Sequence, residues 1–216
     1  MAKAGWGIRH IVVIVFITIG VGVGIFVPSL INIEPPPLTF PETVKGVVVE
    51  SPPRELADFK LTTQASTPFA MSNLKDKWSL VFFGYTHCPD VCPTTMGTLD
   101  RVSRQTTMPG DVQYLFVTVD PKRDTPAKLK EFIDFFNNDK FTALTGDKAE
   151  LDKVTEKFGV TFDYEGDTNA KDYVVNHYAA VFIVDPKARI RAYVLPPHDV
   201  SRVSQVLMAV RNYYGE

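Results

Sequence analysis

The chain has 216 residues, of which 45% are hydrophobic and 22% charged, and its formal net charge is -2 at pH 7. This composition provides enough apolar residues for a packed core, and its balanced charge gives no reason to expect a nucleic-acid partner. The chain contains only two cysteines, which are too few for a scaffold held by several disulfides. If they are functional, they form one disulfide, bind one metal ion or take part in one redox reaction.

The first predicted element is a membrane anchor over residues 11–33, where the run IVVIVFITIGVGVGIFVPSLINI carries no charge. A helix needs about 20 such residues to cross a bilayer, and this run is longer than the apolar core of a cleaved signal peptide. Lys3 and Arg9 precede it and Glu34 follows, so residues 1–10 are expected in the cytoplasm and the rest of the chain outside.

The expected membrane is the bacterial inner membrane, crossed once, with the C-terminal domain in the periplasm. The first ten residues lack the Arg- and Ser-rich amphipathic character of an organelle transit peptide. Residues 34–55 are rich in proline, which predicts an extended, semi-rigid linker. Residues 56–216 then form one domain of roughly 160 residues, without an internal repeat.

Strand and helix patterns alternate along this domain. WSLVFFGY is a short apolar run, typical of a strand buried on both faces, and it leads directly to the first cysteine. The predicted elements, in order, are strand 78–85, a helix capped by Asp90 that runs to about Gln105, strand 112–120, helix 125–136 with Thr125 as N-cap, strand 141–146, helix 147–159 ending at Gly159, hairpin 178–194 turning near Pro186, and helix 199–214. This order predicts an α/β sheet with helices on both faces.

The two cysteines are expected at the carboxyl edge of this sheet, Cys88 in a loop and Cys92 in the first turn of a helix. A helix N-terminus lowers the pKa of a nearby thiol, and the neighbouring residues are polar, so chemistry is favoured over simple packing. Three residues separate the pair, whereas the thioredoxin redox pair has two between its cysteines. This spacing permits either a disulfide or two thiolates on one soft ion such as Cu(I), which needs one more donor.

Four histidines are candidates for that third donor. His10 lies at the edge of the membrane run, and His198 precedes the last helix, where capping is the expected role. His87 adjoins Cys88, but successive side chains on an extended segment point apart. His177 stands where a loop enters an apolar strand, a place where a histidine is more often a core residue than a ligand. The residues alone therefore leave the third donor open.

The motifs YTHCPDVCPTTM, VTVDPKRDTP and FTALTG, followed by a histidine just before an apolar strand, resemble the Sco/SenC (PrrC-type) copper-assembly proteins of cytochrome c oxidase. The resemblance covers residues 56–216 and the N-terminal anchor. It implies a thioredoxin-like fold with an inserted segment, and a copper site made of Cys88, Cys92 and His177. The family commonly has Asp-His-Ser around the histidine ligand, where this chain has Asn176, His177 and Tyr178. Loss of that carboxylate is expected to change the orientation or basicity of the imidazole.

Two functions follow from the resemblance and the thiol chemistry. In the first, the protein is a copper metallochaperone and not an enzyme, and it assists assembly of the binuclear copper centre of cytochrome c oxidase subunit II. In the second, it is a thiol-disulfide oxidoreductase in which Cys88 and Cys92 cycle through a disulfide to keep the partner's cysteines reduced. Either role calls for a further periplasmic partner, a thiol reductant or another copper chaperone. Peroxidase activity is suggested by fold analogy alone.

The segment DPKRDTP, residues 120–126, has two interpretations. Asp120 to Asp124 form a tight turn before a capped helix, which accounts for the residues structurally. The other interpretation is that these residues support or dock at the copper site. The sequence leaves both open, and none of them is predicted to be a ligand.

Overall fold

The computed structural model describes residues 38–40, 45–170 and 172–214. All of these residues belong to one compact unit, which spans residues 38–216. The predicted cytoplasmic segment (1–10) and membrane anchor (11–33) therefore lie outside the described residues. Within the described part, no helix is both long and apolar enough to cross a bilayer.

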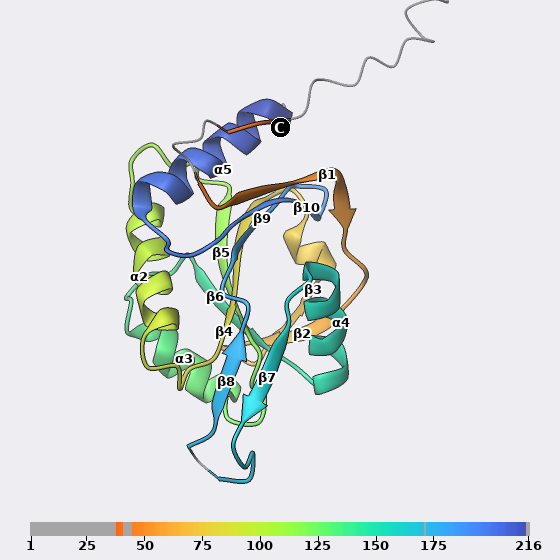
Figure 1. Ribbon diagram of the computed structural model, residues 1–216, viewed down its shortest axis with the longest axis vertical. Helices are drawn as coiled ribbons and strands as arrows, with labels where there is room; N and C mark the ends of the chain where they lie inside the picture. The colour runs from red at the N-terminus through yellow and green to blue at the C-terminus, as the bar shows by residue number, and fades with distance from the viewer. Residues whose placement is uncertain (1–37, 41–44, 171, 215–216) are drawn as a thin grey trace, which may run out of the picture. The chain divides into compact units, whose positions relative to one another are not determined.

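The described unit is built on an eight-stranded mixed sheet (Figure 1). Its strands, from one edge to the other, are β1 (Val47–Glu55), β10 (Arg189–Val194), β9 (Val181–Val184), β4 (Trp78–Gly84), β5 (Val112–Thr118), β6 (Phe141–Thr145), β2 (Lys60–Thr63) and β3 (Pro68–Ala70). Strands β4, β5 and β6 run parallel, and the other pairings are antiparallel. All seven residues of β4 are buried, as expected for a central strand covered on both faces.

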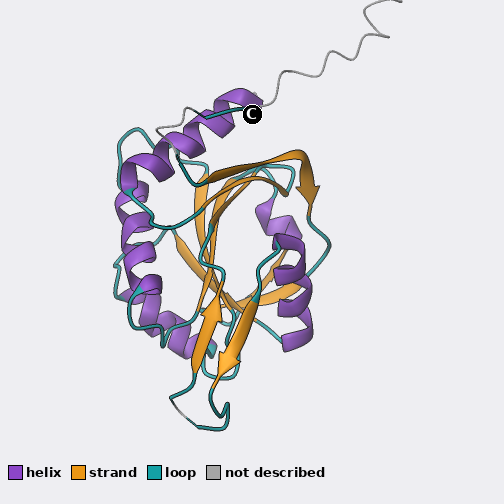
Figure 2. Cartoon of the chain, in the orientation of Figure 1, coloured by secondary structure: helices purple, strands orange, loops and turns teal. Residues whose placement is uncertain are grey.

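The helices lie on both sides of the sheet, which confirms the predicted α/β class (Figures 1 and 2). They are the short 3-10 helix η1 (Met71–Leu74), α2 (Val91–Ser103), α3 (Pro126–Asp134), α4 (Lys148–Phe158) and α5 (Val200–Tyr214). Helices α2 and α3 lie on one side, while α4 lies on the other, where Phe158 packs edge-on against Phe83 of β4 at a ring separation of 5.0 Å. The carboxyl ends of β4 and β5 thus open toward the first turns of α2 and α3.

The start of α3 and the end of α4 have the capping residues that the sequence predicted. The Thr125 hydroxyl accepts a hydrogen bond from the backbone N–H of Lys128 and Pro126 is the first residue of α3. Helix α4 ends at Gly159 with φ +68°, a conformation that glycine adopts without strain. Asp90 precedes α2 as predicted, but its side chain makes no cap hydrogen bond and instead accepts one from the Thr94 hydroxyl at 3.2 Å.

The predicted proline-rich linker over 34–55 is wrong in its second half, because Val47–Glu55 form the edge strand β1 and pair with β10. Because proline has no backbone N–H to donate, the prolines of this segment predicted a spacer. An edge strand nevertheless tolerates proline where its ladder of backbone hydrogen bonds is interrupted. The register of β1 shifts between Val49 and Arg54, and Pro52 and Pro53 fall in that interval. The β2–β3 pair and η1 were not predicted either.

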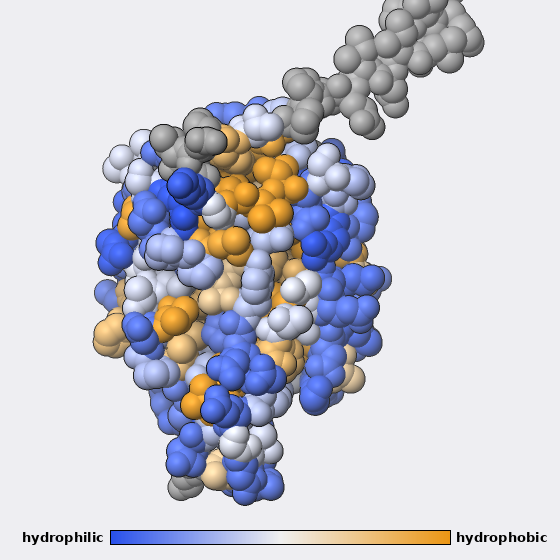
Figure 3. Space-filling model, viewed as in Figure 1, coloured by the Kyte–Doolittle hydropathy of each residue, from blue (hydrophilic) through white to orange (hydrophobic). Residues whose placement is uncertain are grey.

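A separate two-stranded hairpin, β7 (Phe162–Glu165) and β8 (Val174–His177), extends from the main sheet (Figure 1). Its burial alternates along β8, so that Val175 and His177 lie on the covered face while Val174 and Asn176 are exposed. The hairpin end of the molecule is largely hydrophilic on the face shown in Figure 3. This hairpin carries the histidine that the resemblance implies as a ligand.

Candidate metal centre

The cysteine loop follows directly from β4. The backbone N–H of Cys88 donates to the Tyr85 carbonyl at 3.2 Å, which closes a tight turn before α2 begins at Val91. Cys92 is in the first turn of the helix, where backbone N–H groups have no intrahelical partner. Its N–H donates instead to the Cys88 sulfur at 3.4 Å. The helix start therefore directs a hydrogen-bond donor at one of the two thiols.

Gly84, the last residue of β4, makes room for the second thiol. A Cβ atom placed on Gly84 would lie 2.7 Å from Cys92 Sγ and 2.9 Å from the Phe116 ring. Both distances are shorter than the contacts that packed atoms tolerate. Only glycine lets α2 approach the strand closely enough to bury Cys92, whose relative exposure is 0%. A glycine inside a strand pattern often marks such a close approach, but this one was not singled out from the sequence.

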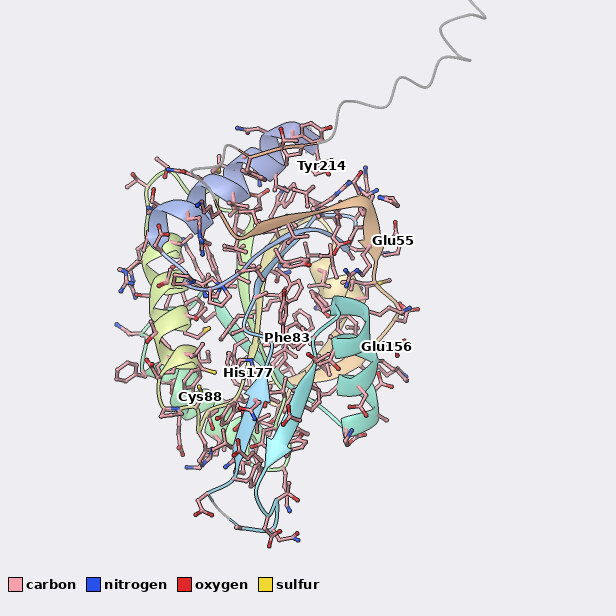
Figure 4. The ribbon with its side chains drawn as sticks, viewed as in Figure 1. Glu55, Phe83, Cys88, Glu156, His177 and Tyr214 are labelled. Atoms are coloured by element: carbon pink, nitrogen blue, oxygen red, sulfur yellow. The ribbon has the colours of Figure 1, made fainter. Side chains whose placement is uncertain are left out.

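His177 approaches the cysteines from the opposite element, the end of β8 (Figure 4). Its Nε2 atom lies 3.5 Å from Cys92 Sγ, and its ring meets the rings of Phe82 and Tyr85 edge-on at 6.1 and 6.0 Å. Its Nδ1 atom is buried and has no hydrogen-bond partner among the described residues. One ligand atom from each of Cys88, Cys92 and His177 lies within 4.8 Å of the others.

The two thiols differ in charge. The Cys88 thiolate accepts a hydrogen bond from the Cys92 thiol, and this bond, together with those from His177 and the Cys92 backbone, outweighs desolvation and lowers the pKa of Cys88 to about 3. The same interaction, with burial, raises the pKa of Cys92 above its usual range. At neutral pH the half-buried Cys88 is therefore a thiolate and the fully buried Cys92 keeps its proton. A soft cation at the site would have to displace that proton.

The DPKRDTP turn contacts the cysteine loop through Asp124, which is fully buried. Its carboxylate accepts hydrogen bonds from the Thr86 N–H at 3.0 Å, the Thr86 hydroxyl at 2.6 Å and the Thr118 hydroxyl at 2.7 Å. Burial raises the pKa of this carboxyl in spite of these bonds. Asp124 thus fixes the loop two residues before Cys88.

The same turn contacts the histidine hairpin through Asp120 and Arg123. The Tyr173 hydroxyl donates to Asp120 at 2.6 Å, and Arg123 donates to the Tyr173 carbonyl at 2.9 Å. The Arg123 guanidinium also lies 3.5 Å from the centre of the Tyr173 ring. Because Tyr173 immediately precedes β8, this turn supports both halves of the site. Both interpretations of the motif therefore apply, and nothing in the sequence indicated Tyr173 as its partner.

The other histidines are outside this cluster. His198 is held by the Thr95 hydroxyl and the Val194 carbonyl, both at 3.1 Å, and burial lowers its pKa. His87 is 45% exposed and its Nδ1 lies 3.1 Å from the Thr86 hydroxyl. His10 is outside the described residues. The structure therefore brings together the three residues that the resemblance implied, and among the described residues no further histidine, cysteine or carboxylate joins them.

Asn176 makes no hydrogen bond to the His177 ring among the described residues. Its exposed amide donates weakly to Asp163 and Glu165 of β7, both at 3.4 Å. Tyr178 is 37% exposed and packs edge-on against Tyr193 at 6.3 Å. The Asn176 side chain therefore has no direct contact by which it could change the orientation or basicity of the His177 imidazole.

Comparison with known proteins identifies similar sequences. The sequence model of the SCO1/SenC family matches residues 49–212. An SCO2-like protein of Rickettsia conorii is 35% identical over 134 residues, which cover 61% of this chain and 65% of that protein. The chain therefore spans just under two thirds of the length of that relative.

Solved structures match over most of the chain as well. The structure of Bradyrhizobium japonicum ScoI with copper bound matches with a TM-score of 0.62 and 33% identity, covering 74% of this chain and 99% of that one. The structure of Arabidopsis thaliana ScoI with copper bound matches with a TM-score of 0.65 and 28% identity, covering 73% and 98%. These proteins share the α/β fold described above.

Proposed function

Because the chain belongs to the SCO1/SenC family, we propose that it is a metallochaperone that binds one copper ion as cargo through Cys88, Cys92 and His177. The observation that carries this proposal is the convergence of three ligand atoms within 4.8 Å, although two come from the loop and helix after β4 and one from a distant hairpin. Two solved relatives with the same fold have copper bound. Their identity to this chain supports transfer of the metal assignment.

The donor set favours Cu(I) as the cargo. Two thiolates and one imidazole are soft or intermediate ligands, which suit Cu(I). A structural zinc site instead requires four protein ligands, and the cluster among the described residues offers three. The partly accessible Cys88 sulfur gives an incoming thiolate a place to attack the bound ion. Delivery by ligand exchange changes no covalent bond in a substrate, so on this proposal the protein is not an enzyme.

The proposed recipient is the binuclear copper centre of cytochrome c oxidase subunit II. The alternative, a thiol-disulfide oxidoreductase acting on the partner's cysteines, would use the same pair, and the low pKa of Cys88 suits it. That reaction gives His177 no task, however, whereas copper binding is strengthened by a third donor. The contact between His177 and Cys92 therefore favours the chaperone.

Copper-loaded full-length chain mixed with the reduced, copper-free domain of an oxidase subunit II should lose its copper to that domain, as measured by the copper content of each protein after the two are separated. Copper-free chain mixed with the oxidised domain should leave the partner's disulfide intact when no other reductant is present. The Cys88→Ser chain is the control for both mixtures. Copper retained by the chain, with reduction of the partner's disulfide instead, would contradict the chaperone and support the oxidoreductase.

We also propose that the chain is held in the bacterial inner membrane by residues 11–33, with the copper-binding domain in the periplasm. The uncharged run and the preceding Lys3 and Arg9 support this orientation. Protease added to spheroplasts should digest the domain, while a cytoplasmic marker protein in the same cells stays intact. Survival of the domain until the spheroplasts are lysed would reverse the orientation.

A further inference from the structure

The second ring nitrogen of His177 is not held by any protein group that the structure describes. Its Nδ1 atom is buried without a hydrogen-bond partner there, while its Nε2 atom lies 3.5 Å from Cys92 Sγ. A histidine that binds a metal ordinarily donates its other ring N–H to a hydrogen-bond acceptor, and this bond fixes the orientation of the ring. Among the described protein groups, the side chains packed around the His177 ring therefore determine its orientation.

Tyr85 contacts this ring from the cysteine side of the site. It directly follows β4, its relative exposure is 3%, and its carbonyl accepts the hydrogen bond from the Cys88 N–H. Its ring meets the His177 ring edge-on, with the two centroids 6.0 Å apart and the planes at 89°. The Arg123 guanidinium lies 5.5 Å from the centre of the same tyrosine ring. One buried aromatic residue thus joins the cysteine loop to the imidazole.

The Tyr85 hydroxyl binds the strand that carries His177. Along an antiparallel pair, residues whose N–H and C=O bond across the pair alternate with residues whose groups point outward. The hydrogen bond from the Tyr178 N–H to the Thr161 carbonyl fixes this alternation, so the Val175 N–H points away from β7. Burial raises the pKa of Tyr85, and the hydrogen bond that its hydroxyl accepts from the Val175 backbone acts in the opposite direction. Tyr85 therefore holds β8 two residues before the ligand.

Other side chains make one of these contacts each. Phe82 meets the His177 ring edge-on at 6.1 Å, but its side chain has no atom that could bind the backbone of β8. The Tyr164 hydroxyl donates to the Val119 carbonyl at 2.8 Å, and this bond attaches β7 to the rest of the domain. Tyr85 combines the two kinds of contact, one to the imidazole and one to its strand.

We propose that Tyr85 is a positioning residue for His177 and keeps the imidazole close enough to Cys92 for both to bind one Cu(I) ion. Its ring sets the orientation of the imidazole, and its hydroxyl sets the position of β8. The proposal deepens the chaperone function and rests on it. Tyr85 is not a ligand, so its effect on copper passes through the imidazole. Loss of its hydroxyl should consequently weaken copper binding only while His177 is present.

Tyr85→Phe keeps the ring and removes the hydroxyl. In competition with a chromogenic Cu(I) chelator, the reduced full-length variant should bind Cu(I) about tenfold more weakly than the wild type, the lower end of the effect of losing a group that supports a metal ligand. X-ray absorption at the copper K-edge should show weaker nitrogen scattering with both sulfurs retained. Tyr114→Phe is the matched control, since it removes a buried hydroxyl that has no partner in the described part of the chain. It should bind copper as the wild type does.

The same substitution in a His177→Ala chain separates positioning from general support of the fold. There Tyr85→Phe should change the copper affinity by less than about twofold, because two residues that act as one unit do not have additive effects. An equal loss of affinity in both chains would overturn the positioning role, and so would wild-type affinity with full nitrogen scattering in Tyr85→Phe. Either result leaves the chaperone proposal standing. A wild-type chain that binds no Cu(I) would instead refute the proposed function itself.

Discussion

Replacement of Cys88 by serine is expected to weaken Cu(I) binding by more than about 100-fold, beyond the range that follows loss of a supporting partner. Cys88 is the thiolate of the pair at neutral pH, with its pKa lowered to about 3, whereas a serine hydroxyl stays protonated and is a hard oxygen donor. The measurement is competition between the reduced full-length chain and a chromogenic Cu(I) chelator. Because Cys88 is only partly buried, the variant should keep the thermal stability of the wild type.

Cys92→Ser should weaken binding at least as strongly, but it tests folding at the same time. Cys92 is fully buried beside Gly84, and serine places a hydroxyl there in place of a sulfur. Cys88→Ser is therefore the cleaner variant, with Val91→Ala as its control at the same helix start. A folded Cys88→Ser chain that binds Cu(I) within about threefold of the wild type would remove this thiol from the site.

Replacement of His177 by alanine is expected to weaken Cu(I) binding by about 10- to 100-fold without abolishing it. Two thiolates can still hold Cu(I) in linear coordination, but the third donor next to Cys92 is lost. The ring is half-buried at the end of a hairpin, so the main sheet does not depend on it. The same chelator competition, with a thermal unfolding curve of each variant, separates lost affinity from lost structure.

Asn176→Ala is the matched control for this prediction. The residue is adjacent to His177, but its exposed side chain lies on the other face of β8 and donates hydrogen bonds to carboxylates of β7. Copper affinity should therefore be unchanged. An unchanged affinity in His177→Ala, or a loss in Asn176→Ala as large as in His177→Ala, would contradict the site as described.

The cysteine half of the site was predictable because its determinants are local. A buried strand, a turn and a helix start follow one another within residues 78–92, and each has its own sequence pattern. The position of His177 depends on contacts between residues that are far apart in the sequence. Its ring lies next to Cys92 because β7 pairs with β8 and because Tyr173 binds Asp120 of the turn. No local pattern encodes such contacts, so the residues alone left this ligand open and only the family resemblance indicated it.

The edge strand β1 shows a related limit. Its prolines predicted a spacer, but the pairing of Val47–Val49 with β10 depends on a partner more than a hundred residues away. By contrast, the hairpin of β9 and β10 and the ends of α3 and α4 followed their local signals. Long-range pairing, and not the local chemistry of the motifs, is what the sequence left undetermined.

The turn over residues 120–124 connects the two halves of the centre physically. Asp124 holds the loop before Cys88, and Asp120 with Arg123 holds Tyr173 before β8. Ligands from separate elements are thus fixed by one short segment between β5 and α3. We infer that this segment keeps the three donors close enough for one ion to bind to all of them at once.

X-ray absorption at the copper K-edge of the reduced full-length chain, loaded with one equivalent of Cu(I), tests the central claim most directly. The account predicts copper bonded to two sulfurs and one nitrogen, supplied by Cys88, Cys92 and His177. Copper bonded to a single sulfur, or to sulfurs without any nitrogen, would contradict it.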